Sequence, residues 1–339
     1  MNEASTSPST GPAEGVPNLP KRPSTPTAVV AVGGHAFIQK GEAGTVEDHE
    51  RNAQALCEQL LMLIERGYNL VVTHGNGPQV GNLMLLQETA TADVPSMPLD
   101  VLVAQTEGSL GYIMQQALLN QLRARDIKRY VETVVTQVVV DVEDGAFDAP
   151  TKPIGPFYDE ETAKEKQRSF GWSIKEDSGR GWRRLVPSPK PIKVIQRRTI
   201  RDSALRGHVV LAGGGGGIPI VVDPETRAYK GVEAVIDKDL TSAVLAREIG
   251  ADLFIILTAV PQVYLGFGTD QQRALGAVTL QEIVQLRDDG HFPAGSMGPK
   301  IDAVIDFLEQ GGQRALVTDP AHLDAAIDGR GGTHFIGRI

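Results

Sequence analysis

The stretch AVVAVGGHAF, residues 28–37, determines the fold that the sequence predicts. Its first five residues are all alanine or valine, which is typical of a strand buried on both faces of a parallel sheet. The run ends at Gly33 and Gly34, and His35 follows at once. Glycine at the carboxyl end of a parallel strand leaves the backbone open to a ligand. We therefore expect a core strand whose end forms part of a binding site.

Further apolar runs follow along the chain, at residues 69–74, 133–141, 208–214, 218–222, 252–260 and 314–319. Amphipathic segments separate them. Residues 56–64 and 301–308, for example, carry leucine, isoleucine or valine at helical spacing, and glycine follows each within a few positions. This alternation predicts an α/β fold with a mostly parallel sheet covered by helices.

Composition narrows the class of protein. The chain has 339 residues and a formal net charge of -9, which argues against general affinity for nucleic acid or anionic membrane. The single cysteine, Cys57, cannot form an intramolecular disulfide, and no apolar stretch is long enough to span a bilayer. We expect a cytoplasmic enzyme that holds any anion locally.

Two segments depart from the alternation. Residues 1–26 are rich in Pro, Ser, Thr and Gly, have few large apolar side chains and resemble neither a secretory signal nor a transit peptide, so we expect a disordered tail. Residues 142–191 are too long for an ordinary connection and combine Pro, Gly, Trp and charged residues. They predict an inserted flap or subdomain, with a merely decorative insertion as the alternative.

Three more segments, residues 71–82, 209–219 and 294–300, place glycine at or just after a predicted strand. One such segment would only mark a turn, but several that converge would form a cradle of backbone N–H groups for an anion. The known phosphate-binding signatures are absent, because no G-x-x-x-x-G-K-[ST] occurs and Val80 stands where G-x-G-x-x-G needs its last glycine. A P-loop and a dinucleotide-binding dehydrogenase are therefore excluded.

Two lysines occupy positions that helices disfavour. Lys238 lies near a predicted helix start, and Lys300 follows a proline suited to a first helical turn. A cation there opposes the helix dipole, at a cost of about 0.3 to 1 kcal/mol when exposed, so we expect an anionic ligand nearby. The alternatives are an ion pair of Lys238 with Asp237 or Asp239, and an exposed Lys300 that pairs with Asp302 or with nothing.

A third lysine, Lys152, lies inside the insertion between Pro150 and Pro153. Proline-rich backbone around a charge is consistent with a lid that reaches over a substrate. A solvated loop lysine is the alternative.

Longer motifs carry a resemblance to a known family. They include THGNGPQVGNL, MPLDVLVAQ, GYIMQQAL, TVVTQVVVD, PTKPIGPFY, GRGWRRLVPSPKP, GGGGIP, GVEAVIDKD, GHFPAGSMGPK and GTHF. On these motifs the chain resembles the carbamate kinases of the amino-acid kinase superfamily from about residue 28 to residue 335. The resemblance implies a three-layer αβα sandwich with two lobes and a protruding subdomain. Residues 27–220 would hold carbamate or carbamoyl phosphate, with the flap at about 142–191, and residues 221–339 the nucleotide.

The resemblance also implies an activity and its site. The reaction would be reversible phosphoryl transfer between carbamoyl phosphate with Mg-ADP and carbamate with Mg-ATP, in a homodimer that serves amino-acid breakdown such as arginine catabolism. Lys238 and Lys300 would contact the transferring phosphoryl oxygens, and Asp239 would orient them. Lys152 would belong to the mobile subdomain that covers the carbamoyl end. The phosphate cradle would consist of Gly33, Gly34, His35, Gly75, Asn76, Gly77, Gly214, Gly215 and Gly216. The nucleotide would contact Tyr264, Met297, Lys238 and Lys300, and no side chain would bind the Mg²⁺ directly.

This reaction agrees with the residues themselves. A carbamate oxygen is already an anion, so its attack on phosphorus needs no strong general base. It needs positioning, and neutralisation of crowded negative charge by lysine, Mg²⁺ and backbone N–H groups. A site of glycines and lysines without a His/Asp/Ser triad fits that requirement.

Two positions depart from the family pattern. The family usually has Gly-Gly-Asn-Ala in its first loop, and this chain has His35 in place of the asparagine. Either His35 keeps the phosphate-facing role and makes activity pH-sensitive, or it turns away. Gln is common at the position of Glu107, whose charge would repel carbamate unless it is protonated, paired with a cation or directed into solvent.

The sequence leaves three alternative functions. An active carbamate kinase is the first, and a paralogue that phosphorylates another small carboxylate or carbamate is the second. A nucleotide-binding sensor without catalysis is the third, which the joint presence of Lys152, Lys238, Asp239 and Lys300 disfavours.

Overall fold

The computed structural model describes residues 25–33, 36–39, 41–89, 95–176, 179, 181–293 and 296–337. Gly34 and His35, which we expected in the phosphate cradle, lie outside the described residues, as do residues 1–24.

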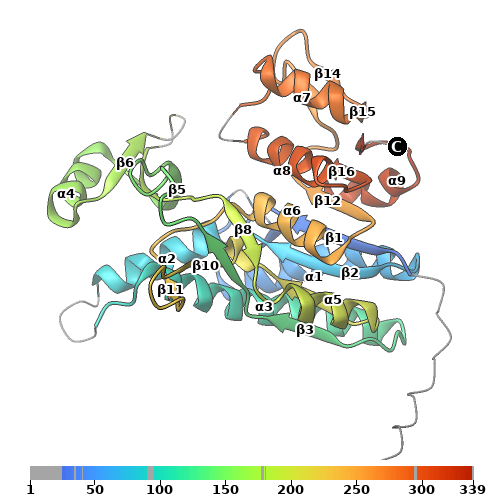
Figure 1. Cartoon of the computed structure of the whole chain (residues 1–339), viewed down its shortest axis with the longest axis horizontal. Coiled ribbons are helices and arrows are strands. Elements are labelled where there is room, and N and C mark those ends of the chain that lie inside the picture. Colours follow the sequence, from blue (N-terminus) through green and yellow to red (C-terminus); the bar gives the residue numbers. More distant parts are fainter. Residues whose placement is uncertain are drawn as a thin grey trace, which may run out of the picture.

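An eight-stranded sheet forms the centre of the protein (Figure 1). Its strands follow the order β15-β17-β16-β12-β1-β2-β9-β3, and every neighbouring pair is parallel except β16 with β17. In that order the strands are β15 (Ala277–Thr279), β17 (Thr333–Ile336), β16 (Arg314–Thr318), β12 (Leu253–Leu257), β1 (Thr27–Val32), β2 (Asn69–His74), β9 (Val209–Ala212) and β3 (Val131–Val134).

The central strand β1 is buried on both faces, as its run of alanine and valine predicts. Ala28, Val30 and Val32 belong to the core on one face of the sheet, and Val29 and Ala31 to the core on the other. Successive side chains of a strand point to opposite faces, so an uninterrupted apolar run needs a helical layer on each side. The expected α/β fold with a mostly parallel sheet is confirmed.

Helices form the outer two layers. One face is covered by α1 (Val46–Glu65), α3 (Leu99–Ala124) and α9 (Leu323–Ile327). The other face is covered by α5 (Arg197–Leu205), α6 (Lys238–Ile249), α7 (Leu280–Asp288) and α8 (Gly298–Glu309). The amphipathic segments at residues 56–64 and 301–308 are parts of α1 and α8, so these two helical predictions are confirmed.

The prediction that residues 133–141 form one strand is wrong. The run breaks at Val135 and Thr136, so that β3 stays in the large sheet while β4 (Gln137–Val140) enters a second sheet. That sheet has the order β11-β10-β4-β8 and contains β11 (Tyr229–Gly231), β10 (Ile218–Val222) and β8 (Pro191–Val194). Periodicity cannot reveal the break, because both halves consist of β-branched residues.

A small sheet projects from the body, at the left of Figure 1. Its strands are β5 (Lys152–Tyr158), β7 (Trp182–Val186) and β6 (Ser173–Glu176), and α4 (Glu160–Phe170) packs on β6 and β7. Below it α2 (Gly77–Thr89) contacts both β5 and α3. The remaining elements are short: β13 (Tyr264–Leu265), β14 (Arg273–Ala274), and the 3-10 turns η2 (Gly214–Gly216) and η3 (Pro320–His322).

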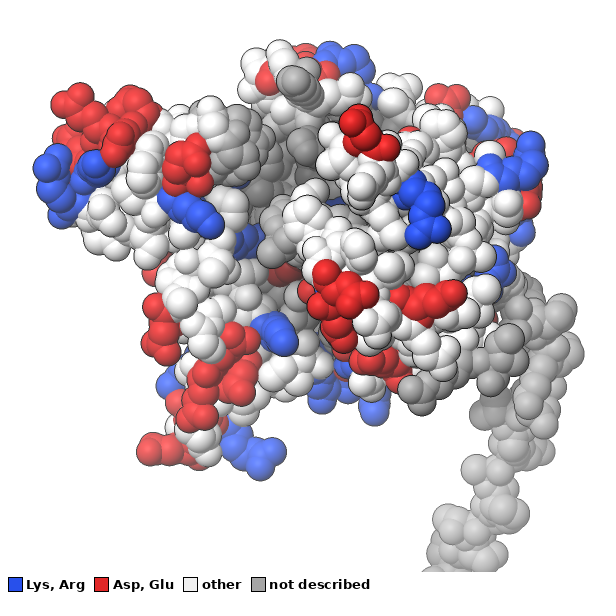
Figure 2. All heavy atoms as spheres, turned by 90° about the horizontal axis from the view of Figure 1, so that it is seen from above, with Lys and Arg blue, Asp and Glu red and all other residues white. Residues whose placement is uncertain are grey.

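Seen from above, the projecting sheet stands apart from the body, with a hollow between them (Figure 2). On this face acidic and basic side chains are interspersed rather than gathered into one basic patch. Among the described residues no helix is both long and apolar enough to cross a membrane.

Candidate functional site

Three glycine-rich loops follow the carboxyl ends of three neighbouring strands of the central sheet. Gly33 follows β1, Gly75 follows β2 and Gly213 follows β9, and these three strands are adjacent and parallel. The Gly75 N–H donates to the carbonyl oxygen of Val32 at 3.1 Å, which joins the first two loops. The carboxyl ends of parallel strands are where ligands bind in such sheets. The described part of the segment at residues 294–300 is different, because residues 296–300 lead into and begin α8 and do not follow a strand.

The loop at residues 213–217 approaches its neighbours too closely for any side chain. Gly213, Gly215, Gly216 and Gly217 have positive φ angles, between 60° and 98°. A Cβ added to Gly215 would lie 2.1 Å from Asn76 Nδ2, and one added to Gly216 would lie 2.3 Å from the carbonyl oxygen of Ile236. Only glycine allows this backbone path. The loop thereby touches both the Gly75–Gly77 segment and Ile236, two positions before the start of α6.

The N-terminus of α6 brings two of the predicted lysines together. Asp237 is the N-cap, and its Oδ1 accepts the backbone N–H of Asp239 at 2.9 Å. The Asp239 carboxylate then accepts a hydrogen bond from Lys238 Nζ on one oxygen and from Lys300 Nζ, at 3.3 Å, on the other. The pairing of Lys238 with Asp239 is therefore correct. The alternative partner of Lys300 is wrong, since Asp302 lies near Arg287 instead.

These charges lie in the interior. Lys238 is 9% exposed and Asp239 is 3% exposed. Burial lowers the pKa of Lys238, and the adjacent Asp239 carboxylate opposes this. A buried ion pair contributes little to stability against an apolar pair of similar size, because the cost of desolvation offsets the attraction. Fold stability alone therefore does not account for these buried charges.

The projecting sheet supplies the third lysine. Lys152, at the start of β5, donates to the carbonyl oxygen of Ile236 at 3.0 Å and to Asp237 Oδ2 at 3.2 Å. Burial of Asp237 favours its neutral form, but the Lys152 and Lys238 ammonium groups favour the ionised form more strongly. The pKa of Asp237 is therefore below its ordinary value. Lys152 is thus bound to the start of α6 and is not a solvated loop lysine. Three lysines and two aspartates meet here, so the five ionised side chains together have one positive charge in excess.

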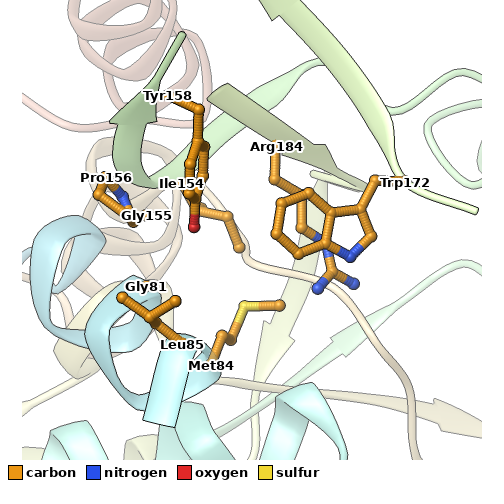
Figure 3. Close-up of a pocket in the computed structure, with 9 residues that line it drawn as sticks. All are labelled: Gly81, Met84, Leu85, Ile154, Gly155, Pro156, Tyr158, Trp172 and Arg184. Carbon is orange, nitrogen blue, oxygen red and sulfur yellow. The ribbon is translucent and has the colours of Figure 1, made fainter. Parts of the chain in front are cut away.

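Beside this lysine, α2 and β5 touch through glycines. A Cβ on Gly81 would lie 2.0 Å from Gly155 Cα, so the two backbones are in direct contact. Figure 3 shows the small pocket next to this contact, with Met84 from α2, Tyr158 from β5, Arg184 from β7 and Trp172 from the turn before β6 around it. The contact links α2, which begins at the second glycine loop, to the strand that carries Lys152.

Glu107 lies beneath the third glycine loop. Its side chain is buried, with the residue 2% exposed, and Oε2 accepts the Thr136 N–H at 2.9 Å. Burial raises the pKa of Glu107 well above its ordinary value. This effect is larger than that of the backbone N–H groups of Thr136 and Gly214, which lower the pKa. Of the alternatives considered for this residue, direction into solvent is wrong.

Two of the four expected nucleotide contacts, Tyr264 and Met297, are not part of the lysine cluster. Tyr264 is on β13, where its ring contacts that of Phe267 at a centroid distance of 5.9 Å. Met297 precedes α8 and packs against the larger core. Among the described residues, no side-chain hydrogen bond joins either of them to the three lysines.

Sequence reasoning missed the parts that Asp237 and Thr136 play. Asp237 was considered only as a partner of Lys238, although an aspartate directly before a predicted helix is a recognisable cap. Thr136 gave no signal, because a threonine within a run of valines is ordinary in a strand.

Comparisons with known proteins point to one family. The sequence profile of the Amino acid kinase family matches residues 26–319. A carbamate kinase of Pyrococcus furiosus is 48% identical over 91% of this chain and 98% of that protein. A carbamate kinase-like protein of Escherichia coli, YahI, is 44% identical over 91% and 98%. The solved carbamate kinase from Giardia lamblia bound to AMP-PNP has a TM-score of 0.85 at 37% identity, and the match covers 93% of this chain and 99% of that one.

Proposed function

This chain belongs to the amino acid kinase family and, within it, to the carbamate kinases, so it is a phosphotransferase, and we propose that it transfers a phosphoryl group reversibly between carbamoyl phosphate and ADP. The products in the direction of ATP synthesis are ATP and carbamate, which decomposes to ammonia and carbon dioxide. One observation carries the proposal. Lysines from two helices share the buried Asp239 at the edge of the sheet where the glycine loops meet.

The proposed mechanism relies on charge and position. The N–H groups of Gly33, Gly77, Gly214 and Gly215 would form the cradle for the phosphoryl oxygens, whereas Gly75 and Gly216, whose N–H groups donate to the carbonyl oxygens of Val32 and Gly213, would shape its loops. Lys238 and Lys300 neutralise the charge that builds up on these oxygens in an in-line transfer, and Asp239 orients the two lysines. Lys152 holds the carbamoyl end. A carboxyl-type oxygen is already ionised, so no general base is required.

Magnesium would enter as part of the substrate, bound to the phosphates of ADP or ATP. Among the described residues no three His, Cys, Asp or Glu side chains gather as a metal cluster, and the two aspartates of the site are bonded to lysines. Mg²⁺ commonly keeps several waters and is held largely by substrate phosphates, so this donor set fits a nucleotide-borne ion. Its contribution would be further neutralisation of phosphate charge.

The remaining parts of the proposal follow from the family. Residues 27–220 would bind carbamate or carbamoyl phosphate, with the flap at about 142–191. Residues 221–339 would bind the nucleotide, with Tyr264 and Met297 near it. A homodimer in the cytoplasm, active in arginine catabolism, completes the proposal.

The test is a panel of phosphoryl donors. Purified protein is incubated with ADP and Mg²⁺ and with carbamoyl phosphate, acetyl phosphate or no donor, and ATP is measured. We expect ATP from carbamoyl phosphate at a rate at least ten times that from acetyl phosphate. The reverse preference would instead support a paralogue acting on another carboxylate. ADP binding without ATP from any donor would identify a sensor.

The paralogue is retained because of one residue. Glu107 differs from the common glutamine and lies beneath the glycine loop. If its carboxyl group were ionised, it would disfavour every anionic acceptor, and ATP formation from carbamoyl phosphate and from acetyl phosphate would both be slow.

A further inference from the structure

The loop at residues 213–217 needs an external support. Glycine gives it the conformations it requires but also makes the free backbone flexible. A cradle contributes to transfer only if its N–H groups are already in place, because the benefit comes from preorganisation. Some other part of the protein must therefore hold both ends of this loop.

Thr136 contacts both ends of the loop. Its Oγ1 accepts the N–H of Gly213 at 2.9 Å, and its carbonyl oxygen accepts the N–H of Ile218 at 2.8 Å. Thr136 is fully buried, at the break between β3 and β4. One residue thus closes the loop from outside, and its bond to Ile218 continues the parallel pairing of β4 with β10.

Glu107 in turn holds Thr136. Its Oε2 accepts the Thr136 N–H at 2.9 Å from the middle of α3. The helix approaches β3 closely here, since a Cβ on Gly111 would lie 2.4 Å from Thr133 Cγ2. The Cγ of Glu107 also lies 3.1 Å from the position of a Cβ on Gly214, so the side chain fills the space directly beneath the loop.

Among the described residues, the second carboxyl oxygen of Glu107 is buried and makes no hydrogen bond, although the backbone N–H of Gly214 lies close enough to favour the ionised form. An ionised carboxylate in that position would have too little compensation, whereas a neutral carboxyl group is tolerated there. The raised pKa agrees with the neutral form. A neutral acid offers one acceptor and one donor, as a glutamine amide does.

We propose that Glu107 and Thr136 are positioning residues, which fix the glycine loop at residues 213–217 through the chain Glu107 Oε2, Thr136 N–H, Thr136 Oγ1 and Gly213 N–H. Neither residue is assigned a contact with substrate. The inference rests on the proposed function, in which this loop holds the phosphoryl group.

The experiment compares matched variants. Thr136→Ser keeps the hydroxyl, while Thr136→Val keeps the shape and removes it. Glu107→Gln keeps the acceptor, while Glu107→Leu removes it. For each protein, kcat and KM for carbamoyl phosphate, ADP affinity and the melting temperature are measured. Amide hydrogen exchange at Gly213 and Ile218 is followed in the protein without substrate.

We expect Thr136→Val and Glu107→Leu to lower kcat about tenfold or more, since displaced donors cost at least that much, with ADP affinity unchanged. Exchange at Gly213 should accelerate in both. Thr136→Ser and Glu107→Gln should restore kcat to within about threefold of wild type and restore slow exchange.

The proposal is overturned if Thr136→Val and Thr136→Ser have equal kcat and equal exchange. It is also overturned if Glu107→Gln loses as much kcat as Glu107→Leu. If one variant does not fold, the pair at the other position decides. If wild type forms no ATP, the proposed function fails, and the exchange measurement still tests the positioning role by itself.

Discussion

Lys300 Nζ lies 3.3 Å from Asp239 Oδ2, although 61 positions separate the two residues and they belong to different helices. Lys238 binds the other oxygen of the same carboxylate. Asp239 therefore sets the spacing of two ammonium groups that would otherwise repel each other. An arriving phosphoryl group would find two cations already in place, which is the preorganisation that transfer requires.

Asp239→Asn tests this arrangement. The amide keeps the size of the side chain but neutralises neither lysine, and loss of the carboxylate removes the interaction that supports the charged form of Lys238. We expect kcat for ATP formation to fall by about 100-fold or more. A melting curve checks folding, since breaking a buried pair costs about 3 to 5 kcal/mol. Wild-type kcat in a folded Asp239→Asn protein would contradict the assigned role.

Lys152→Ala removes the link between the projecting sheet and the start of α6. The hydrogen bonds to Ile236 and Asp237 are lost, so we expect kcat/KM for carbamoyl phosphate to fall about 10- to 100-fold while ADP affinity changes little. Steady-state kinetics and calorimetry measure the two quantities. Lys164→Ala is the control, because Lys164 lies on α4 and its ion pair within the described part of the chain is with the exposed Glu160. An equal loss in both variants would mean that the effect is not specific to Lys152.

Gly81→Ala tests the contact that seats β5. The new Cβ would lie 2.0 Å from Gly155 Cα, and backbone cannot yield as a flexible side chain does. We expect β5 to shift and kcat/KM to fall about tenfold or more. Gly108→Ala, in an open part of α3, should leave activity unchanged and add about 0.5 to 1 kcal/mol of helix stability.

A double variant shows whether Gly81 acts through Lys152. If it does, Gly81→Ala combined with Lys152→Ala will be no slower than Lys152→Ala alone. Fully additive losses would instead place the effect of Gly81 elsewhere.

His74 predicts a dependence of stability on pH. Its ring is fully buried, and burial lowers the pKa of His74 to about 4, below its ordinary value of 6.5. The unfolded chain therefore binds a proton that the folded protein does not, and stability falls as pH drops from about 6.5 to 4. The full effect is about 3 kcal/mol.

Urea unfolding at pH 7 and pH 4.5 measures this effect in wild type and His74→Gln. The free-energy difference between the two proteins should shrink by about 2 to 3 kcal/mol at the lower pH. His322→Gln, at an exposed histidine, controls for loss of an imidazole. A constant difference between wild type and His74→Gln would contradict the prediction.

The sequence predicted most of the central sheet. The strands at Thr27–Val32, Asn69–His74 and Leu253–Leu257 consist mainly of apolar residues because they are buried on both faces, and burial of that kind is visible in composition. Antiparallel β17 (Thr333–Ile336) was missed, because four residues that include a polar pair give too short a pattern.

The site was predictable in its residue types and less so in its contacts. Glycine after a strand and lysine at a helix start are local signals, and they led to Gly75, Lys238 and Lys300. The partner of Lys300 was not predictable, because Asp239 lies on another helix and only the packing of α6 against α8 brings it close. The support from Glu107 and Thr136 depends likewise on long-range contacts.

The central claim is that Lys238 and Lys300, held by Asp239, neutralise the phosphoryl group that passes between carbamoyl phosphate and ADP. The most direct measurement is the rate of ATP formation from these two substrates by wild type and by Lys300→Ala, with ADP affinity determined for both. The account predicts ATP formation by wild type and a kcat at least 100-fold lower in Lys300→Ala, with the protein folded and ADP still bound. ATP formation at the wild-type rate in Lys300→Ala would contradict it.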